Sequence, residues 1–215
     1  MTIHSSRPLV IAHHLVWTAY GWWLPNDPRG SMSTAITSDT IAELGELHYG
    51  RKKLQPCSAA IRDFYHRAES HLKHALLAFD ADEVALVGEA FCQVVRDQRL
   101  TCYAGAIMPD HVHLLVRKHR LKAEEMIQQL QAASAAVLRT VGRRSPHHPV
   151  WGGPGWKVFL DHPDEVRRTI CYIQQNPVKL RRPAQRWDFV QNYDGWPLHP
   201  GHDPNSPYAR RLRDR

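Results

Sequence analysis

The segment Leu100–Arg117 constrains the fold of this 215-residue chain more than any other. Two runs rich in apolar and β-branched residues, Leu100–Met108 and His111–Arg117, flank the turn-forming pair Pro109-Asp110. Strands joined by so short a connection pair antiparallel, because a parallel pair needs a crossover of a dozen or more residues. The sequence therefore predicts an antiparallel hairpin.

Further strands and helices are expected on both sides of this hairpin. The expected strands are Leu9–Thr18 and the end of Pro149–Leu160, and the expected helices are Ser58–Leu77, Ala81–Arg96, Ala123–Val141 and Pro163–Gln175. The order strand, helix, strand, strand, helix, strand, followed by a further helix, is that of a ferredoxin-like unit. We therefore predict the α+β class, with an antiparallel sheet, helices packed on it and a long insertion after the first strand.

The stretch after the first predicted strand is punctuated by proline and glycine and holds one short helical pattern, Ser38–Leu47. We interpret about residues 20–60 as an insertion within a single domain of residues 1–198. Residues 199–215 are interpreted as a basic, flexible tail. Residues 32–62 carry no motif that indicates a role.

The chain is basic, because 28 Lys and Arg residues exceed 21 Asp and Glu residues and give a net charge of +7. Such a balance favours a polyanionic partner, most often nucleic acid, and an ordinary basic enzyme is the alternative. No apolar run reaches the ~18 residues of a membrane span, and no secretory signal is visible, so we expect a cytoplasmic protein without a membrane partner. The four cysteines form no C-x-x-C pair, which argues against a zinc ribbon or a thioredoxin-type motif.

The pair His111 and His113 is the first candidate for chemistry. On a strand, residues two apart face the same side, so both imidazoles share one face while Val112 points into the opposite layer. Two imidazoles on a rigid strand form half of a divalent metal site. The alternative is two surface histidines in a chain that has 15 of them.

Tyr172 and Asn176 are the second candidate pair. At positions i and i+4 of the last predicted helix they share a face. We expect Pro177 to stop that helix and to push Asn176 out of regular helix geometry, which leaves its side chain free to coordinate a metal. The alternative for Tyr172 is a packed aromatic ring with a solvated hydroxyl.

Two motifs in the chain resemble those of a known family. Met108–Val116 (MPDHVHLLV) and Tyr172–Leu180 (YIQQNPVKL) are similar to the two signature motifs of single-tyrosine HUH transposases, and most similar to those of REP-associated tyrosine transposases. His14–Ser31 also resembles the first strand and following loop of one branch of that family, and Trp151–Asp161 lies between the two motifs. The resemblance spans most of residues 10–197.

This resemblance implies a reaction and a set of site residues. The family cuts single-stranded DNA near hairpins through a 5′-phosphotyrosine, and the matching nucleophile here is Tyr172. The matching metal ligands are His111, His113 and Asn176, with Mg²⁺ or Mn²⁺ as the metal. A phenol of pKa ~10 is a poor nucleophile at neutral pH, and a divalent cation lowers the barrier by polarising the phosphate and stabilising the leaving oxygen.

Other residues are candidates for contacts with DNA or for support of the site. We expect phosphate contacts from His14, Lys157, Lys179, Arg181 and Arg182, and base stacking from Trp22, Trp23 and Trp156. His14 is alternatively a packed or exposed histidine, and each tryptophan is alternatively a cap on the core. Asp110 either orients a histidine ring or only forms the turn.

The sequence leaves three functions in competition. The preferred one is a metal-dependent single-stranded DNA endonuclease and strand transferase, that is, a transposase acting at DNA hairpins. The second is a catalytically silent, domesticated protein that binds hairpin DNA. The third is a zinc hydrolase of a small substrate, which lacks an acidic general base beside the histidines. A monomer and a homodimer, with Tyr172 acting on its own or on a partner's metal site, are both compatible with the sequence.

Overall fold

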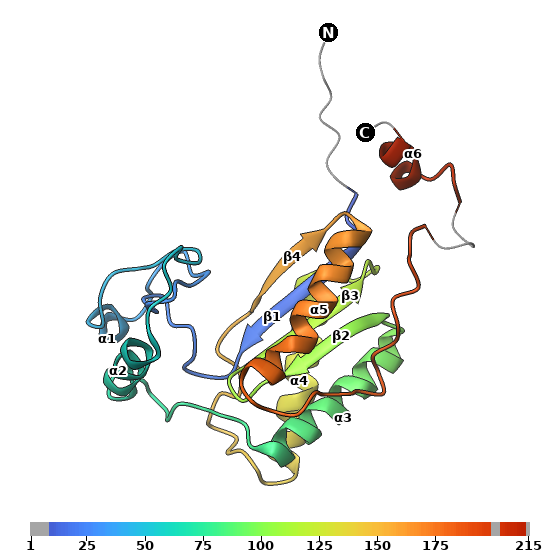
Figure 1. The fold of residues 1–215 in the computed structure, drawn as a ribbon. Helices are drawn as coiled ribbons and strands as arrows, with labels where there is room; N and C mark the ends of the chain where they lie inside the picture. The colour runs from blue at the N-terminus through green and yellow to red at the C-terminus, as the bar shows by residue number, and fades with distance from the viewer. Residues whose placement is uncertain (1–8, 199–202, 214–215) are drawn as a thin grey trace.

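A four-stranded antiparallel sheet forms the centre of the computed structural model, which describes residues 9–198 and 203–213 (Figure 1). Its strands are β1 (Ala12–Thr18), β2 (Cys102–Ile107), β3 (His111–Arg117) and β4 (Trp156–Leu160), in the order β2-β3-β1-β4. Every neighbouring pair is antiparallel, and β2 and β3 form the predicted hairpin. This strand order, with helices between β1 and β2 and between β3 and β4, is ferredoxin-like and confirms the predicted α+β class.

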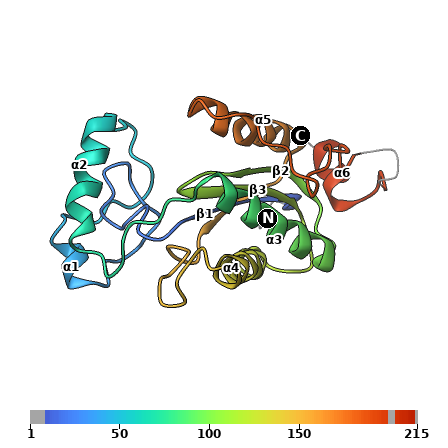
Figure 2. The same cartoon turned by 90° about the horizontal axis from the view of Figure 1, so that it is seen from below.

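Helices cover both faces of the sheet (Figure 2). The helices α3 (Ala81–Gln98) and α4 (Ala123–Thr140) pack against each other on one face, and α5 (Pro163–Lys179) crosses the other. The apolar core is therefore in two parts. Trp17, Phe91 and Leu130 belong to the part under α3 and α4, and Leu115 and Ile173 belong to the part under α5.

The sequence of α3 explains where this helix begins and which of its sides is buried. Asp80 caps the helix by accepting from the Glu83 backbone N–H at 2.8 Å, and the Glu83 carboxylate accepts from the Asp80 N–H at 3.1 Å. Val87, Phe91 and Val95 follow at intervals of four and lie in the core. The cap and the apolar stripe thus fix both the start of α3 and the face that it turns to the sheet.

The predicted insertion after β1 forms a lobe at one end of the sheet (Figures 1 and 2). It contains α1 (Asp39–Ala42) and α2 (Ser58–Glu69). Its own apolar cluster contains Ile41, Leu44, Phe64, Tyr65 and Ala68. The helix predicted over Ser58–Leu77 ends at Glu69, because the chain beyond it pairs with other loops: the Leu77 N–H donates to the Tyr20 carbonyl at 3.1 Å.

The prediction that Pro177 stops the last helix is wrong. The helix α5 continues to Lys179 with Pro177 inside it, so Asn176 lies within the helix rather than beyond its end. Proline removes only its own N–H bond to the carbonyl of Ile173, and here it falls in the last turn, where that loss is smallest. Pro177 is buried, and this burial offsets the missing bond.

The chain after α5 packs back on the core. Trp187 and Phe189 stack at 6.0 Å between ring centroids and lie against the α3 side of the sheet. The helix α6 (Pro207–Arg213) places the buried side chain of Tyr208 in the cluster on the α5 side. Residues 199–202 and 214–215 of the expected tail lie outside the described residues, and the domain boundaries stay a prediction. No helix in the described part of the chain is long and apolar enough to cross a membrane.

Candidate functional site

Strand register sets the directions of the histidines. In the pairing of β1 with β3, Val16 is opposite His113 and His14 is opposite Leu115. Val112 is fully buried under α3 and α4, and His111 and His113 face the other side and line a cavity there. The predicted common face of the two imidazoles is confirmed. His14 shares that face, and its Nε2 lies 3.0 Å from Nδ1 of His113.

The helix α5 brings Tyr172 to these histidines. Its ring lies edge-on to that of His113 with 5.6 Å between centroids, and 6.1 Å from the ring of His14. Tyr172 is 42% exposed, so its hydroxyl is open to solvent and to a ligand. A phenol from the helix and two imidazoles from the sheet therefore meet within one chain.

A cavity of about 340 Å³ lies at this meeting point, bounded by the sheet, α5 and the insertion lobe. The residues of the cavity that bear on chemistry include His111, His113, Tyr172, Asn176 and Lys179. None of its described lining residues carries a carboxylate, whereas three carry a fixed positive charge: Arg29, Arg51 and Lys179. The cavity therefore favours an anionic ligand.

His14 and His113 are neutral at pH 7. Burial lowers the pKa of His14 to about 4. Burial also lowers the pKa of His113 well below its usual value, with smaller contributions from His111 and His14. Of two neutral imidazoles that share a hydrogen bond, one donates and the other accepts. If His113 donates from Nδ1, its Nε2 keeps a free lone pair.

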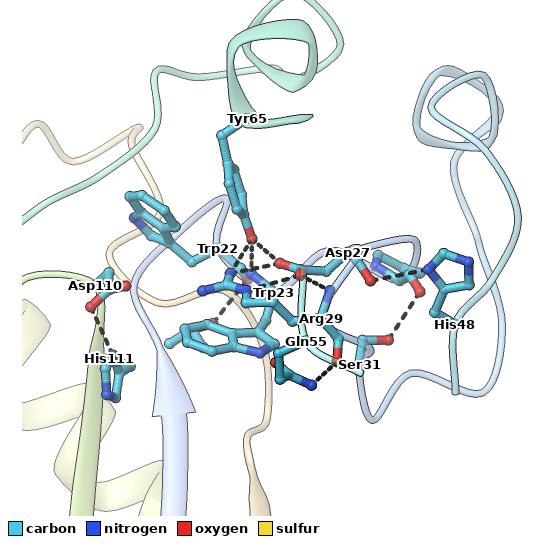
Figure 3. Close-up of polar contacts among 12 residues, drawn as sticks. Trp22, Trp23, Asp27, Arg29, Ser31, His48, Gln55, Tyr65, Asp110 and His111 are labelled. Carbon is cyan, nitrogen blue, oxygen red and sulfur yellow. Dashed lines mark hydrogen bonds and ion pairs between the residues drawn. The ribbon is translucent and has the colours of Figure 1, made fainter. Parts of the chain in front are cut away.

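Asp110 contacts the other histidine of the pair (Figure 3). Its Oδ1 lies 2.7 Å from Nδ1 of His111. Burial by itself raises the pKa of Asp110, but the hydrogen bond and charge of His111 outweigh burial, so the net pKa lies below its usual value. An ionised Asp110 accepts the Nδ1 proton of His111 and leaves Nε2 of that ring as the basic atom, as in metal-binding histidines.

These contacts test whether the cavity fits a divalent metal. The two imidazoles use their Nδ1 atoms in hydrogen bonds, so each has Nε2 for coordination. Nδ2 of Asn176 is buried without a hydrogen-bond partner among the described residues, and a half-turn of the amide exchanges this atom with an oxygen. No three His, Cys, Asp or Glu side chains gather for a metal in the part of the chain that the structure describes. Two imidazoles and an amide oxygen, with waters, fit Mn²⁺ or Mg²⁺ better than a closed zinc site.

The expected DNA-binding residues are not all brought to the site. Lys179 lines the cavity, with its Nζ 5.1 Å from the centroid of the Tyr172 ring. Arg181 and Arg182 are exposed just after α5. The expectation for Lys157 needs correction: its ammonium pairs with Glu124 of α4, on the opposite face of the sheet.

The three tryptophans differ in their surroundings. Trp22 donates from Nε1 to the Leu77 carbonyl at 2.7 Å and packs on Tyr65, so it is a cap on the core. Trp23 and Trp156 line the cavity.

From the insertion lobe we expected only tryptophans at the site, and we missed the charged and polar residues that this lobe contributes. Arg29, Arg51 and Gln55 of this lobe line the cavity. The guanidinium of Arg29 lies over the ring of Trp23, 3.7 Å from its centroid. Arg29 falls within the segment His14–Ser31 that carries part of the family resemblance, which is the one signal that pointed to it.

Comparison with known proteins gives one family match and several similar structures. Residues 72–162, which include β2, β3 and both histidines but end before Tyr172, match the family described as transposase IS200 like. The structure of a REP-associated tyrosine transposase bound to a REP hairpin is 11% identical, over 84% of this chain and 74% of that one, with a TM-score of 0.43. The structure of a "putative transposase" from Deinococcus radiodurans R1 is 14% identical, over 86% of this chain and 100% of that one, with a TM-score of 0.33. No curated protein matches the chain.

Proposed function

We propose, for a chain whose residues 72–162 match the IS200-like transposase family, a metal-dependent endonuclease and strand transferase of single-stranded DNA at hairpins, with Tyr172 as nucleophile. The observation that carries this proposal is the edge contact of Tyr172 with His113 in a cationic cavity, 5.6 Å between ring centroids. A small-substrate hydrolase is less well supported, because no described residue that lines the cavity carries a carboxylate to act as a general base, and the carboxylate of Asp110 is engaged with Nδ1 of His111.

The reaction is a phosphoryl transfer. The hydroxyl oxygen of Tyr172 forms a bond to phosphorus as the bond from phosphorus to the 3′ oxygen breaks. The phenolic proton passes to water, which reaches the exposed side of Tyr172, and the 3′ oxygen leaves as a hydroxyl after taking up a proton. The phosphodiester is exchanged for a phosphotyrosyl ester, so a second DNA 3′ hydroxyl can reverse the step without another source of energy.

His111, His113 and Asn176 are the residues that would hold the metal. When bound, a divalent cation supplies Lewis-acid polarisation of the phosphate. Asp110 and His14 fix the orientations of the two imidazoles through their Nδ1 atoms. Lys179 adds a positive charge close to the Tyr172 ring, where it attracts the phosphate.

We propose further that Tyr172 works together with the imidazoles of its own chain, so that one protomer supplies the whole site. The contact distances of the Tyr172 ring to His14 and His113 are reached within one protomer, with no partner present. A homodimer is compatible with this arrangement and is not required for it.

The experiment is a trapping assay with a labelled library of single-stranded DNA hairpins and Mn²⁺. The wild-type chain should form a covalent adduct that survives denaturation, and Tyr172→Phe should form none while it still binds the hairpins. Tyr49→Phe is the matched control, because Tyr49 is 65% exposed and does not line the cavity. Hairpin binding without any adduct from the wild-type chain would instead identify a catalytically silent binding protein.

A further inference from the structure

The insertion lobe forms part of the wall of the cavity that contains Tyr172. Trp23, Arg29, Arg51 and Gln55 line this cavity together with Tyr172 and Lys179 from α5. All four of these lobe residues lie within residues 23–55, between β1 and α2. The lobe therefore contributes directly to the surface on which a substrate would lie.

The hydroxyl of Tyr65 holds this wall in place (Figure 3). It accepts a hydrogen bond from the Trp23 backbone N–H at 2.8 Å and another from Nη2 of Arg29 at 2.9 Å. It donates to Oδ2 of Asp27, which is fully buried. A hydroxyl has one donor and two acceptor positions, so Tyr65 uses its whole capacity. Since Tyr65 lies on α2, the helical part of the lobe sets the position of the wall.

The backbone of the wall is held in unusual conformations. Trp23 has a φ of +53°, which a bulky residue rarely adopts. The guanidinium of Arg29 lies over its ring, and the ring of His111 meets it at a steep angle with 5.4 Å between centroids. Gly30 approaches Gly50 so closely that an added Cβ atom would lie 1.8 Å from the Gly50 carbonyl oxygen. Strain of this kind persists where surrounding contacts over-determine it, and it is typical of ligand-binding sites.

Charge indicates what the wall can bind. The carboxylate of Asp27 balances Arg29, with Nη2 and Oδ2 2.7 Å apart. Arg51 is exposed and makes no ion pair among residues 9–198 and 203–213, so its charge is available to a ligand. The cavity also has an apolar part, to which Met32, Met108 and Trp156 contribute. A free cation beside an aromatic and apolar surface matches a nucleotide, which has an anionic phosphate and a flat base.

We propose that this wall binds one unpaired nucleotide of single-stranded DNA next to the phosphate that Tyr172 attacks. Arg51 contacts a backbone phosphate, and the base lies against the aromatic surface that Trp23 and Trp156 provide. Tyr65 is a positioning residue that acts through Trp23 and Arg29. The inference rests on the proposed function for the identity of the strand, and it assigns a role to the insertion lobe.

The phosphate contact is tested by the salt dependence of binding. The protein carries Tyr172→Phe so that no cleavage occurs, and fluorescence anisotropy follows its binding to a fluorescein-labelled twelve-nucleotide dT strand at several KCl concentrations. Arg51→Ala should make the slope of log K against log salt shallower by about 0.7, the value for one lost contact to single-stranded DNA. Arg139→Ala is the matched control, an exposed arginine of α4 on the opposite face of the sheet, and should leave the slope unchanged.

The base contact is tested with an abasic strand of the same length. The protein should bind the dT strand about five-fold or more tightly than the abasic strand, because stacking of a base on an aromatic side chain favours binding by at least that factor. Tyr65→Phe should reduce the preference for the dT strand and keep the salt slope. If Tyr65 only stabilised the fold, the folded variant would keep the full preference. Trp156→Ala is a second variant for the same comparison, because it removes an aromatic ring of the cavity and leaves the hydrogen bonds of Tyr65 in place.

The two proposals fail in different ways. Equal affinity for the dT and abasic strands, no binding of the dT strand, or an unchanged slope in Arg51→Ala would each overturn the nucleotide site. None of these results bears on whether Tyr172 forms an adduct with hairpin DNA. Conversely, a normal preference for the dT strand without any adduct would support the nucleotide site and contradict the proposed endonuclease activity.

Discussion

Nε2 of His14 on β1 and Nδ1 of His113 on β3 lie 3.0 Å apart and share one proton between two neutral rings. This contact comes from the register that sets Val16 opposite His113, two residue pairs from His14 and Leu115, so that His14 and His113 share a face. It fixes the ring of His113 through Nδ1 and leaves Nε2 for the proposed metal. The strand β1 therefore supports the site through His14 in addition to its place in the middle of the sheet.

Replacing His14 should weaken metal binding. His14→Phe keeps an aromatic ring in the space but removes the partner of His113, and loss of such a supporting contact typically costs 10–100-fold in metal affinity. Titration of Mn²⁺ into the free protein, followed by electron paramagnetic resonance, measures this directly. His71→Phe, at a histidine of the insertion lobe outside the cavity, is the control. An unchanged Mn²⁺ affinity in His14→Phe would contradict the supporting role.

The two lysines near the site in the sequence should differ in their effects on DNA binding. Lys179→Ala should lower the affinity for a single strand and make the salt slope shallower by about 0.7, because Lys179 lines the cavity. Lys157→Ala should change neither, because Lys157 pairs with Glu124 on the other face. Anisotropy titrations at several KCl concentrations compare the two variants. An equal loss of DNA affinity in both variants would contradict the orientation of Lys157 toward α4.

Formation of the covalent adduct should require Tyr172 and the imidazoles to be on the same chain. A mixture of Tyr172→Phe with His113→Ala contains one intact tyrosine and one intact metal site, but on different chains. Because the ring contact is made within one protomer, the mixture should form no covalent adduct on denaturing gels. Adducts that reappear on mixing would show instead that the tyrosine acts across a dimer.

Gly88→Ala should destabilise the fold even though alanine is the better helix former by about 1 kcal/mol. A Cβ atom at Gly88 would lie 2.2 Å from Cζ3 of Trp187, so the returning chain would have to move from α3. We expect a net loss of about 1–3 kcal/mol in the free energy of unfolding, measured by urea denaturation. Adding Trp187→Leu should recover part of this loss. A more stable Gly88→Ala protein would contradict the packing of Trp187 on α3.

The parts of the site that follow from local periodicity were predictable from the sequence. A period of two put His111 and His113 on one face, and a spacing of four put Tyr172 and Asn176 on one face of a helix. The hairpin and the order of elements then gave the sheet topology. The two shared faces and the hairpin depend on neighbours within a few residues in the sequence, whereas the pairing of β1 with β3 followed from the order of elements.

The errors have two physical sources. Lys157 was assigned by its closeness in sequence to the site, but it pairs with Leu15, whose side chain faces α3 and α4, so strand register sends it away from Tyr172. Pro177 was expected to end the helix, but burial of this residue offsets one lost bond in the last turn.

The role of the insertion lobe depends on contacts that no periodic pattern encodes. The hydroxyl of Tyr65 meets Trp23, Asp27 and Arg29 across 36 to 42 positions of the sequence. Propensity and spacing describe α2 as a helix and its apolar face as buried. They contain no information on the loop that the hydrogen bonds of the Tyr65 hydroxyl hold.

The most direct measurement of the central claim is the position of the DNA on the protein. The adduct formed with a single-stranded hairpin and Mn²⁺ is digested with trypsin and nuclease, and the peptides are sequenced by mass spectrometry. The account predicts a nucleotide phosphate on Tyr172, in the peptide of residues 169–179. A nucleotide on any other residue, or no modified peptide from a protein that binds the hairpin, would contradict it.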